Sequence, residues 1–277
     1  MTKSEPTGSA AIIIPARYAS VRFPAKPLHL IRGADGQQKP LIQHSFEAAL
    51  RVSTADSVYV ATDDERIAGA VREFGGKVIM TPNSCANGTE RIAACLDAVP
   101  NADLLVNFQG DALLTPPHAV AAMVSWMQDH GDAGAATVAV PCSPETYRHL
   151  AEDAAAGRVG GTTVVTDDAG RALYFSKRIL PYIAPGAMPS AERPVLLHLG
   201  LYAYRRTALE AYVAGGPCDL EQIEGLEQLR FLVRGVPMHV VKVAPPNWDI
   251  VEVNNPEDVP IVEAILTRRA QDEKIND

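Results

Sequence analysis

The first half of the chain alternates short apolar runs with amphipathic stretches, and this alternation constrains the fold more than any other feature. Residues 11–14 read Ala-Ile-Ile-Ile, a continuous apolar run that is typical of a buried parallel strand. Further strand patterns occur at 57–61, 77–80 and 104–108, and helical patterns at 41–50, 65–74, 89–98 and 117–129. Strands and helices that alternate at this spacing predict an α/β fold with a mostly parallel sheet and right-handed crossovers.

The second half is less regular. A proline-rich stretch over 180–194 predicts a long surface loop, and apolar residues that recur every three or four positions predict one helix over 220–233, ending near Gly235. A last helix is expected from Pro256 to about Arg269. Strand patterns occur at 135–140, 162–165, 172–175, 198–204 and 238–243. Because no repeat or linker is visible, we expect one domain over 1–277, with its core at about 10–268 and a smaller lobe at about 141–220.

Composition excludes several classes of protein. Apolar residues make up 47% of the 277, enough for a large core, and the net charge of −8 weighs against a nucleic-acid or anionic-membrane surface. The first apolar run is too short for a membrane span, so a cytoplasmic protein is expected. No C-x-x-C pair or zinc-like spacing occurs, and the cysteines are expected to be reduced. They stand at positions 85, 95, 142 and 218.

A basic loop follows the first predicted strand directly. It carries Arg17, Arg22 and Lys26 at spacings of four or five, with Ser20 and other small residues between them. Ligands of open α/β sheets bind beyond the carboxyl ends of strands, and a triphosphate needs cationic donors beside a closely approaching backbone. The loop is neither a Walker A nor a G-x-G-x-x-G sequence. The alternative is a solvated basic loop without a ligand.

An acidic residue follows the fourth predicted strand. Gly110 lets backbone come close, and Asp111 next to it places a carboxylate where a Mg²⁺ ion could lie between protein and phosphates. An ordinary turn aspartate is the alternative. The basic loop on a neighbouring strand end favours the metal ligand.

Eight motifs in order then resemble one family. They are IIIPARYASVRFPAKPL, VATDDERI, NGTERIA, NFQGD, ALYFSK, HLGLYAYRR, LEQIEGLEQLRFL and NNPEDV, from about residue 10 to 268. Together they resemble the CMP-Kdo synthetases (3-deoxy-manno-octulosonate cytidylyltransferases). The resemblance implies a GT-A-like, Rossmann-like nucleotidyltransferase fold with a mixed, mostly parallel sheet flanked by helices. It also implies a homodimer that uses CTP and Mg²⁺ and releases pyrophosphate; the choice of cytosine and the dimer rest on the resemblance alone.

The resemblance also assigns site residues by position. Arg17, Lys26 and Asp111 match catalytic positions, and Asp111 matches a magnesium ligand. The positions that match the CTP site are Ala16, Arg17, Ser20, Arg22, Lys26, Asn87, Gly88, Arg91 and Gly110. Those that match the acceptor site are Gln109, Lys177, His198, Tyr202, Glu227 and Gln228. From the residues alone, Glu227 and Gln228 could equally belong to a solvated helix face, and His198 could be structural.

The sequence departs from the family pattern at four places. Ala112 follows Asp111 where a second carboxylate is usual, and Asn87 replaces a serine. Lys177 replaces an arginine, which keeps the charge but loses bidentate geometry. Asn254 replaces an aspartate that is expected to bind metal. We hypothesise that Glu252, or less favourably Asp249, supplies the missing carboxylate, because residues 252 and 254 of an extended segment point the same way.

These observations predict a Mg²⁺-dependent cytidylyltransferase that transfers CMP from CTP to an acidic acceptor such as 3-deoxy-manno-octulosonate. Because the departures fall on the metal and acceptor side, two alternatives stay open. One is the same chemistry on a phosphonate such as phosphonoformate. The other is a nucleotide-binding protein that has lost catalysis.

Overall fold

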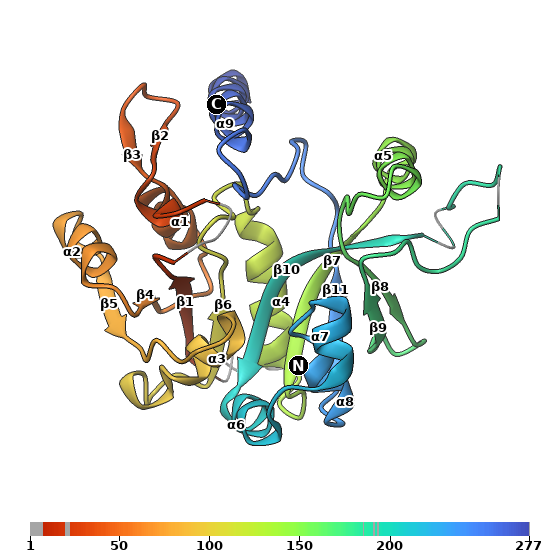
Figure 1. Cartoon of the computed structure of the whole chain (residues 1–277), viewed down its shortest axis with the longest axis horizontal. Helices are drawn as coiled ribbons and strands as arrows, with labels where there is room; N and C mark the ends of the chain where they lie inside the picture. The colour runs from red at the N-terminus through yellow and green to blue at the C-terminus, as the bar shows by residue number, and fades with distance from the viewer. Residues whose placement is uncertain (1–7, 20–22, 185, 191, 193, 277) are drawn as a thin grey trace, which may run out of the picture. The chain divides into compact units, whose positions relative to one another are not determined.

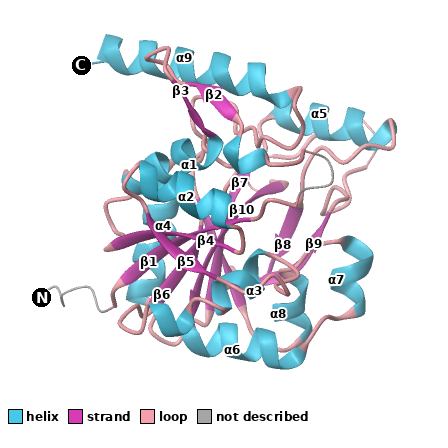
Figure 2. Cartoon of the chain, turned by 60° about the vertical axis from the view of Figure 1, so that its left-hand side comes forward, coloured by secondary structure: helices cyan, strands magenta, loops and turns pink. Residues whose placement is uncertain are grey.

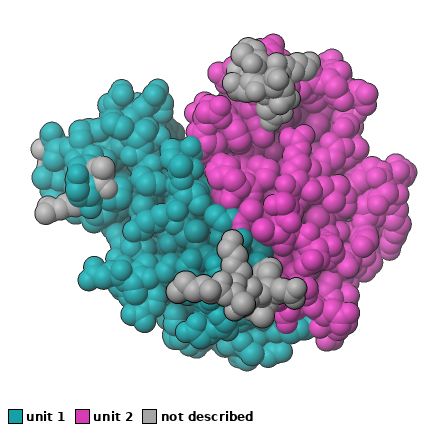
Figure 3. All heavy atoms as spheres, turned by 180° about the vertical axis from the view of Figure 1, so that it is seen from behind, with its two compact units in different colours: residues 1–7, 122–245 teal, residues 8–121, 246–277 magenta. Residues whose placement is uncertain are grey.

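The computed structural model describes residues 8–19, 23–184, 186–190, 192 and 194–276, with side chains to residue 271. Ser20 and Arg22 of the predicted basic loop lie outside the described residues. Contacts divide the described chain into two compact units, coloured in Figure 3. Unit 2 comprises residues 8–121 and 246–276, and unit 1 comprises residues 122–245.

Unit 2 contains a sheet of four parallel strands in the order β6-β1-β4-β5 (Figure 1). The strands are β1 (Ala10–Ala16), β4 (Ser57–Thr62), β5 (Lys77–Met80) and β6 (Leu104–Asn107). Ile12, Ile13 and Ile14 are fully buried, as expected for a strand with neighbours on both sides. Strands β1, β4, β5 and β6 confirm the four sequence-predicted strands and their parallel arrangement.

Helices connect these strands and pack against them. Helices α1 (Leu41–Leu50) and α2 (Glu65–Glu73) contact β4, and α3 (Gly88–Ala93) contacts β1 and β6. The rest of the unit consists of the short helices η1 (Lys26–Leu28) and η2 (Leu96–Ala98), the hairpin β2 (Leu30–Arg32) with β3 (Gln38–Pro40), and α9 (Asp258–Asn276). The prediction of one helix over 89–98 was wrong. The chain tightens into a 3₁₀ turn after Ala93, and Pro100 prevents the helix from continuing.

Unit 1 is built on β7 (Ala135–Pro141), which pairs in parallel with β11 (Met238–Lys242) and antiparallel with β10 (Leu196–Arg205). Strand β10 also pairs with β8 (Thr163–Thr166), which pairs with β9 (Ala172–Ser176). Helix α4 (Pro117–Asp129) crosses the boundary between the units. Figure 2 shows the strands in magenta and the helices in cyan. The strand pairings and the helices on the sheets confirm the mixed, mostly parallel α/β class.

Four helices of unit 1 differ from the sequence prediction. Helices α5 (Pro144–Ala155) and α6 (Arg206–Gly215) were not predicted, although Ser143, whose hydroxyl caps α5 through the Thr146 N–H, was a readable start signal. The single helix over 220–233 is two helices, α7 (Asp219–Glu224) and α8 (Leu229–Val233). Gly225 ends α7 in the left-handed conformation, with φ of 63°. The proline-rich stretch after Leu180 is irregular where it is described, as expected.

The compact unit that holds the expected lobe over 141–220 is longer than that lobe, since it runs from residue 122 to 245. All four cysteines are free in the structure. Among the described residues, no helix is both long and apolar enough to cross a membrane.

A buried ion pair joins α7 to α8. The guanidinium of Arg230, whose side chain is 1% exposed, donates to both carboxylate oxygens of Glu221 at 2.7 and 2.6 Å. The same guanidinium lies 4.0 Å from the ring centroid of Tyr212 on α6. Because both charges are removed from water, each depends on the other for compensation.

We predict that Glu221→Ala lowers the free energy of unfolding by about 3–5 kcal/mol, because it leaves the Arg230 charge buried and unpaired. Urea unfolding followed by circular dichroism measures the loss. The double variant Glu221→Ala/Arg230→Met should recover most of it, since no uncompensated charge is left. A single variant as stable as the wild type would contradict this account of the pair.

Candidate active site

The chain leaves β1 and β6 at the same edge of the unit 2 sheet. The two strands pair in parallel with Ile13 opposite Asn107, and the Phe108 N–H donates to the Ile13 carbonyl at 3.1 Å. The segments that follow, 15–17 and 109–111, therefore emerge side by side. This is the arrangement that the sequence predicted for the basic loop and the acidic residue.

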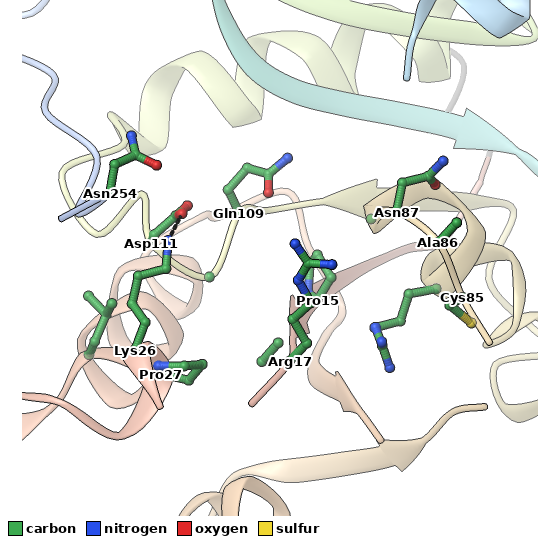
Figure 4. Close-up of a pocket in the computed structure, with 15 residues that line it drawn as sticks. Pro15, Arg17, Lys26, Pro27, Cys85, Ala86, Asn87, Gln109, Asp111 and Asn254 are labelled. Carbon is green, nitrogen blue, oxygen red and sulfur yellow. Dashed lines mark hydrogen bonds and ion pairs between the residues drawn. The ribbon is translucent and has the colours of Figure 1, made fainter. Parts of the chain in front are cut away.

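A cavity of about 420 Å³ opens at this edge, and Figure 4 draws the residues that line it. They are Pro15, Ala16, Arg17, Lys26, Pro27, Leu41, Cys85, Ala86, Asn87, Gly88, Arg91, Gln109, Gly110, Asp111 and Asn254. The cavity thus gathers residues that follow β1, β5 and β6, together with one from the C-terminal segment. Every described residue that the sequence assigned to the CTP site lies in this lining.

Gly110 is required at its position by close packing. A Cβ atom there would lie 2.9 Å from the backbone oxygen of Pro15, which no rotation of a side chain could relieve. The Gly110 carbonyl accepts a hydrogen bond from the Ser45 hydroxyl of α1 at 2.9 Å. Glycine therefore allows the Asp111 turn to pack directly on the end of β1.

Lys26 and Asp111 face each other in the cavity and form an ion pair between Nζ and Oδ2 (dashed in Figure 4). Their side chains are 17% and 21% exposed, so the pair is mostly shielded from water. Lys26 opens η1 after Ala25, which adopts a left-handed conformation, and Pro27 fixes the next turn. The prediction that these two side chains lie opposite one another at one site is confirmed.

Arg17 is exposed and lines the same cavity. In Figure 4 it lies between the Lys26–Asp111 pair and Asn87, with Gln109 above it. A cation in the middle of the cavity and a second cation at one end form a suitable lining for a chain of phosphates.

Asn87 and Arg91 hold the other end of the cavity. Asn87 caps α3, since its Oδ1 accepts the Glu90 N–H at 2.8 Å. Asparagine and serine are comparable helix caps, which explains why the family serine can be replaced here. Arg91 is 3% exposed, and its guanidinium donates to the Thr81 hydroxyl at 2.5 Å and to Asp63 Oδ2 at 3.0 Å.

Asn254 reaches the cavity because the preceding residue is anchored in the core. Val253 is fully buried in an apolar cluster with Leu113, Leu114 and Val262, and its N–H donates to the Asp111 carbonyl at 3.2 Å. The C-terminal segment is thereby tied to the residue that carries the carboxylate. Asn254 lies beside Asp111 in Figure 4.

Glu252 lies next to Asn254, as the extended-segment argument expected. The Asn254 Nδ2 group donates to Glu252 Oε2 at 3.4 Å. Asn254 lines the cavity, whereas Glu252 and the exposed Asp249 are absent from the described lining. Glu252 is therefore one hydrogen bond removed from the cavity, and its role as a metal ligand stays a prediction.

The donor set of the cavity fits Mg²⁺. Within the described part of the chain, no three His, Cys, Asp or Glu side chains gather in a metal-binding arrangement. Mg²⁺ does not need such a cage, because it commonly binds one or two carboxylates, substrate phosphates and water. Asp111 supplies a carboxylate, and Asn254 and Gln109 supply amide oxygens in the same cavity.

Two predicted acceptor residues, His198 and Tyr202, are buried in unit 1. Their rings lie 5.3 Å apart, and the His198 ring also packs on Phe175 at 5.1 Å. The Thr137 hydroxyl donates to the Leu201 carbonyl, so it accepts from His198 Nε2 at 2.9 Å. Burial lowers the pKa of His198 to about 3, and the ring is neutral near pH 7.

Lys177 is exposed at the end of β9 and reaches α7. The Glu224 carboxylate accepts hydrogen bonds from Ser176 Oγ at 3.0 Å and from the Lys177 N–H at 3.3 Å. A Cβ atom on Gly225 would lie 2.7 Å from the Lys177 ammonium. The positive φ of Gly225 is what favours glycine at this turn, since the flexible lysine end could move aside.

Glu227 and Gln228 were expected to lie on a helix, and this prediction was wrong. They occupy the turn between α7 and α8, where Gly225 breaks the predicted helix. Gln228 is 2% exposed, and its Nε2 has no hydrogen-bond partner among the described residues. A buried amide of this kind could serve a ligand, so its role in acceptor binding stays a prediction.

Sequence reasoning missed several residues of the site. Asp63 and Thr81 fix Arg91, and Cys85 lines the cavity. Asp63 lies just beyond the predicted strand over 57–61, within the motif VATDDERI, so its position was a usable signal. Cys85 carried no such signal, because only the fold brings it to the cavity.

Comparison with known proteins agrees with this geometry. Residues 11–242 match the family model described as Cytidylyltransferase. The chain is 40% identical over 267 residues to the 3-deoxy-manno-octulosonate cytidylyltransferase of Maricaulis maris, across 95% of this chain and 99% of that protein. It is 38% identical to the 8-amino-3,8-dideoxy-manno-octulosonate cytidylyltransferase of Shewanella pealeana, across 94% and 99%. The solved structure of CMP:2-keto-3-deoxy-manno-octonic acid synthetase complexed with CTP superposes with a TM-score of 0.79 at 37% identity, covering 94% of this chain and 99% of that chain.

An α/β sheet whose strand ends assemble cations and one carboxylate around a cavity suits a nucleotidyltransferase, and the comparisons show that class. The matches run over nearly the whole chain at close to 40% identity. The chain belongs to the cytidylyltransferase family, as a CTP-dependent member of the CMP-Kdo synthetases, and the family resemblance seen in the sequence is confirmed.

We predict that Lys26→Ala lowers the turnover rate by a factor on the order of 10²–10³, since it removes a preorganised cation from the cavity. Pyrophosphate release under saturating substrates measures the effect. Lys77→Ala is the matched control, because Lys77 is an exposed lysine of the same unit that packs near the Tyr59 ring. Near-normal turnover of the Lys26 variant would refute the catalytic role.

Proposed function

We propose that the chain transfers CMP from CTP to 3-deoxy-manno-octulosonate or a close analogue such as its 8-amino derivative, releases pyrophosphate and uses Mg²⁺. The observation that carries the proposal is the Lys26–Asp111 pair across one cavity with Arg17 between its ends. Relatives at about 40% identity that bear these acceptors in their names support the choice of acceptor.

In the proposed mechanism, a hydroxyl oxygen of the sugar acid attacks the α-phosphorus of CTP in line with the departing pyrophosphate. The new P–O bond replaces the bond to pyrophosphate, and the hydroxyl proton passes to water. Arg17 and Lys26 stabilise the charge that grows on the leaving group, and they orient the α-phosphate. Asp111, with Asn254 beside it, would hold Mg²⁺, which neutralises phosphate charge when bound. Asn87 and the first turn of α3 close the end of the cavity that we assign to the cytidine.

A second candidate acceptor is a phosphonate, such as phosphonoformate. The observation in its favour is Asn254, a neutral amide in the cavity where a carboxylate is usual for the family. A phosphonate oxygen is already ionised near neutral pH, so its attack needs no proton removal. Its several anionic oxygens could also complete a metal site that has a single protein carboxylate.

A panel of acceptors tests both candidates. The purified protein is incubated with CTP, Mg²⁺ and each of 3-deoxy-manno-octulosonate, its 8-amino derivative and phosphonoformate, with pyrophosphate release as the measurement. Turnover on a sugar acid supports the proposal, and turnover on phosphonoformate alone replaces it with the second candidate. CTP binding without pyrophosphate release on any acceptor would indicate a nucleotide-binding protein without catalysis.

The assembly proposed for this protein is a homodimer, which rests on the family resemblance. Sedimentation velocity at micromolar concentration tests it directly. A species with the mass of a single chain across the concentration range would overturn the proposal.

We predict that Asn254→Asp lowers the Mg²⁺ concentration that gives half-maximal activity, by about threefold to tenfold, because a carboxylate binds a hard cation better than an amide does. Glu252→Gln should raise this Mg²⁺ concentration. Magnesium titrations of initial rate measure both shifts. An unchanged Mg²⁺ concentration for half-maximal activity in both variants would exclude a metal site that involves Asn254 and Glu252.

The double variant separates two roles for Glu252. If Glu252 only orients the Asn254 amide through the 3.4 Å contact, then Glu252→Gln has no effect in the Asn254→Asp background. If Glu252 is itself a metal ligand, its loss raises the Mg²⁺ requirement in both backgrounds.

A further inference from the structure

Tyr18 follows Arg17 at the start of the basic loop and has no part in the mechanism above. Its ring stacks against the guanidinium of Arg66, whose Cζ lies 3.3 Å from the ring centroid. Arg66 belongs to the first turn of α2, which follows β4 rather than β1. The contact therefore ties the beginning of the basic loop to a neighbouring strand-to-helix connection.

Arg66 is held in a fixed orientation from its other side. Its Nε and Nη2 groups donate to the two carboxylate oxygens of Asp64, at 2.9 and 2.6 Å. Asp64 also caps α2, since its Oδ1 accepts the Arg66 N–H at 2.9 Å. The Arg66 guanidinium holds the pKa of Asp64 below its usual value, so this carboxylate stays ionised near neutral pH. The planar guanidinium presents a defined face to the ring.

The backbone of Tyr18 reaches the far end of the same loop. Its carbonyl accepts the Ala25 N–H at 3.2 Å, and the Lys26 N–H donates to the Phe23 carbonyl at 3.2 Å. Ala25 has a φ of 56°, and among the described residues it is the one non-glycine residue with a positive φ. Tyr18 therefore adjoins Arg17 in sequence, and its carbonyl holds Ala25, the residue directly before Lys26.

We propose that Tyr18 is a positioning residue for CTP. Its ring, stacked on the Arg66–Asp64 pair, holds Arg17 and Lys26 at the spacing that the phosphates of the nucleotide require. Tyr18 acts through these two cations and does not touch the substrate. Cations that are fixed before the substrate arrives lose less entropy on binding it and need no rearrangement during the reaction. The inference rests on the proposed use of CTP.

Four variants test this role. CTP binding in the presence of Mg²⁺ is measured by isothermal titration calorimetry, which needs no acceptor, and KM and kcat follow from pyrophosphate release. Tyr18→Ala should weaken CTP binding and raise KM for CTP by about two- to fivefold, the range expected for loss of one cation–π contact to an exposed guanidinium. Tyr18→Phe keeps the stacked ring and should stay within about twofold of the wild type.

Coupling between the two residues gives a readout that a merely structural role would not move. Arg66→Gln should weaken CTP binding as Tyr18→Ala does. The double variant should bind CTP as tightly as the single variant with the lower affinity, because both substitutions remove the same contact. Arg72→Gln is the matched control, because Arg72 is an exposed arginine of the same helix that pairs with Glu65 at 3.1 Å. Thermal unfolding identifies any variant that fails to fold.

Several outcomes would overturn the inference. They are wild-type CTP affinity and KM in folded Tyr18→Ala, additive losses in the double variant, or a Tyr18→Phe defect as large as that of Tyr18→Ala. Failure of the proposed function is distinct, since the wild type itself would then show no CTP binding by calorimetry.

Discussion

The parallel pairing of β1 with β6 is the constraint on which the site depends. It brings the segments after the two strands to one edge, and Gly110 lets them pack without an intervening side chain. Only then can Lys26 meet Asp111 in a partly shielded environment, where a charge contact is stronger than in open water. The register of β1 and β6 sets the position of the site. Helix α3, the contact between Tyr18 and Arg66, and the C-terminal segment then hold its residues in place.

The sequence predicted the first half of the fold well, because buried parallel strands and capped helices leave strong local patterns. Helix α1 and strand β5 have the bounds expected from periodicity and stop signals. The second half was harder. The helix over 220–233 failed at Gly225, since apolar spacing alone could not reveal that Leu220 and Ile223 are exposed while Leu229 is buried.

The candidate site, too, could be predicted from the sequence only in part. The ligand loop and Asp111 could be placed from strand ends alone, because parallel neighbours share an edge. The partners that fix them could not, since Asp63 and Val253 come from distant parts of the chain. The exchange of serine for Asn87 has a local physical reason in the helix cap, whereas the exchange of aspartate for Asn254 changes the charge of the cavity. Among the acceptor residues of unit 1, Lys177 departs from the family's pattern, and burial lowers the pKa of His198, which disfavours a cationic ring beside an acidic acceptor near pH 7.

Unit 2 is discontinuous in sequence, and this has a consequence for how the protein is made. Asn254 lines its cavity, and Val253 holds the segment that carries this residue in an apolar cluster built from both ends of the unit, within residues 23–114 and 248–266. During translation the strands of unit 2 are synthesised early, but the apolar cluster can be completed only after residues 248–266 have been synthesised. A chain that stopped after unit 1 would therefore lack Asn254 and part of this cluster.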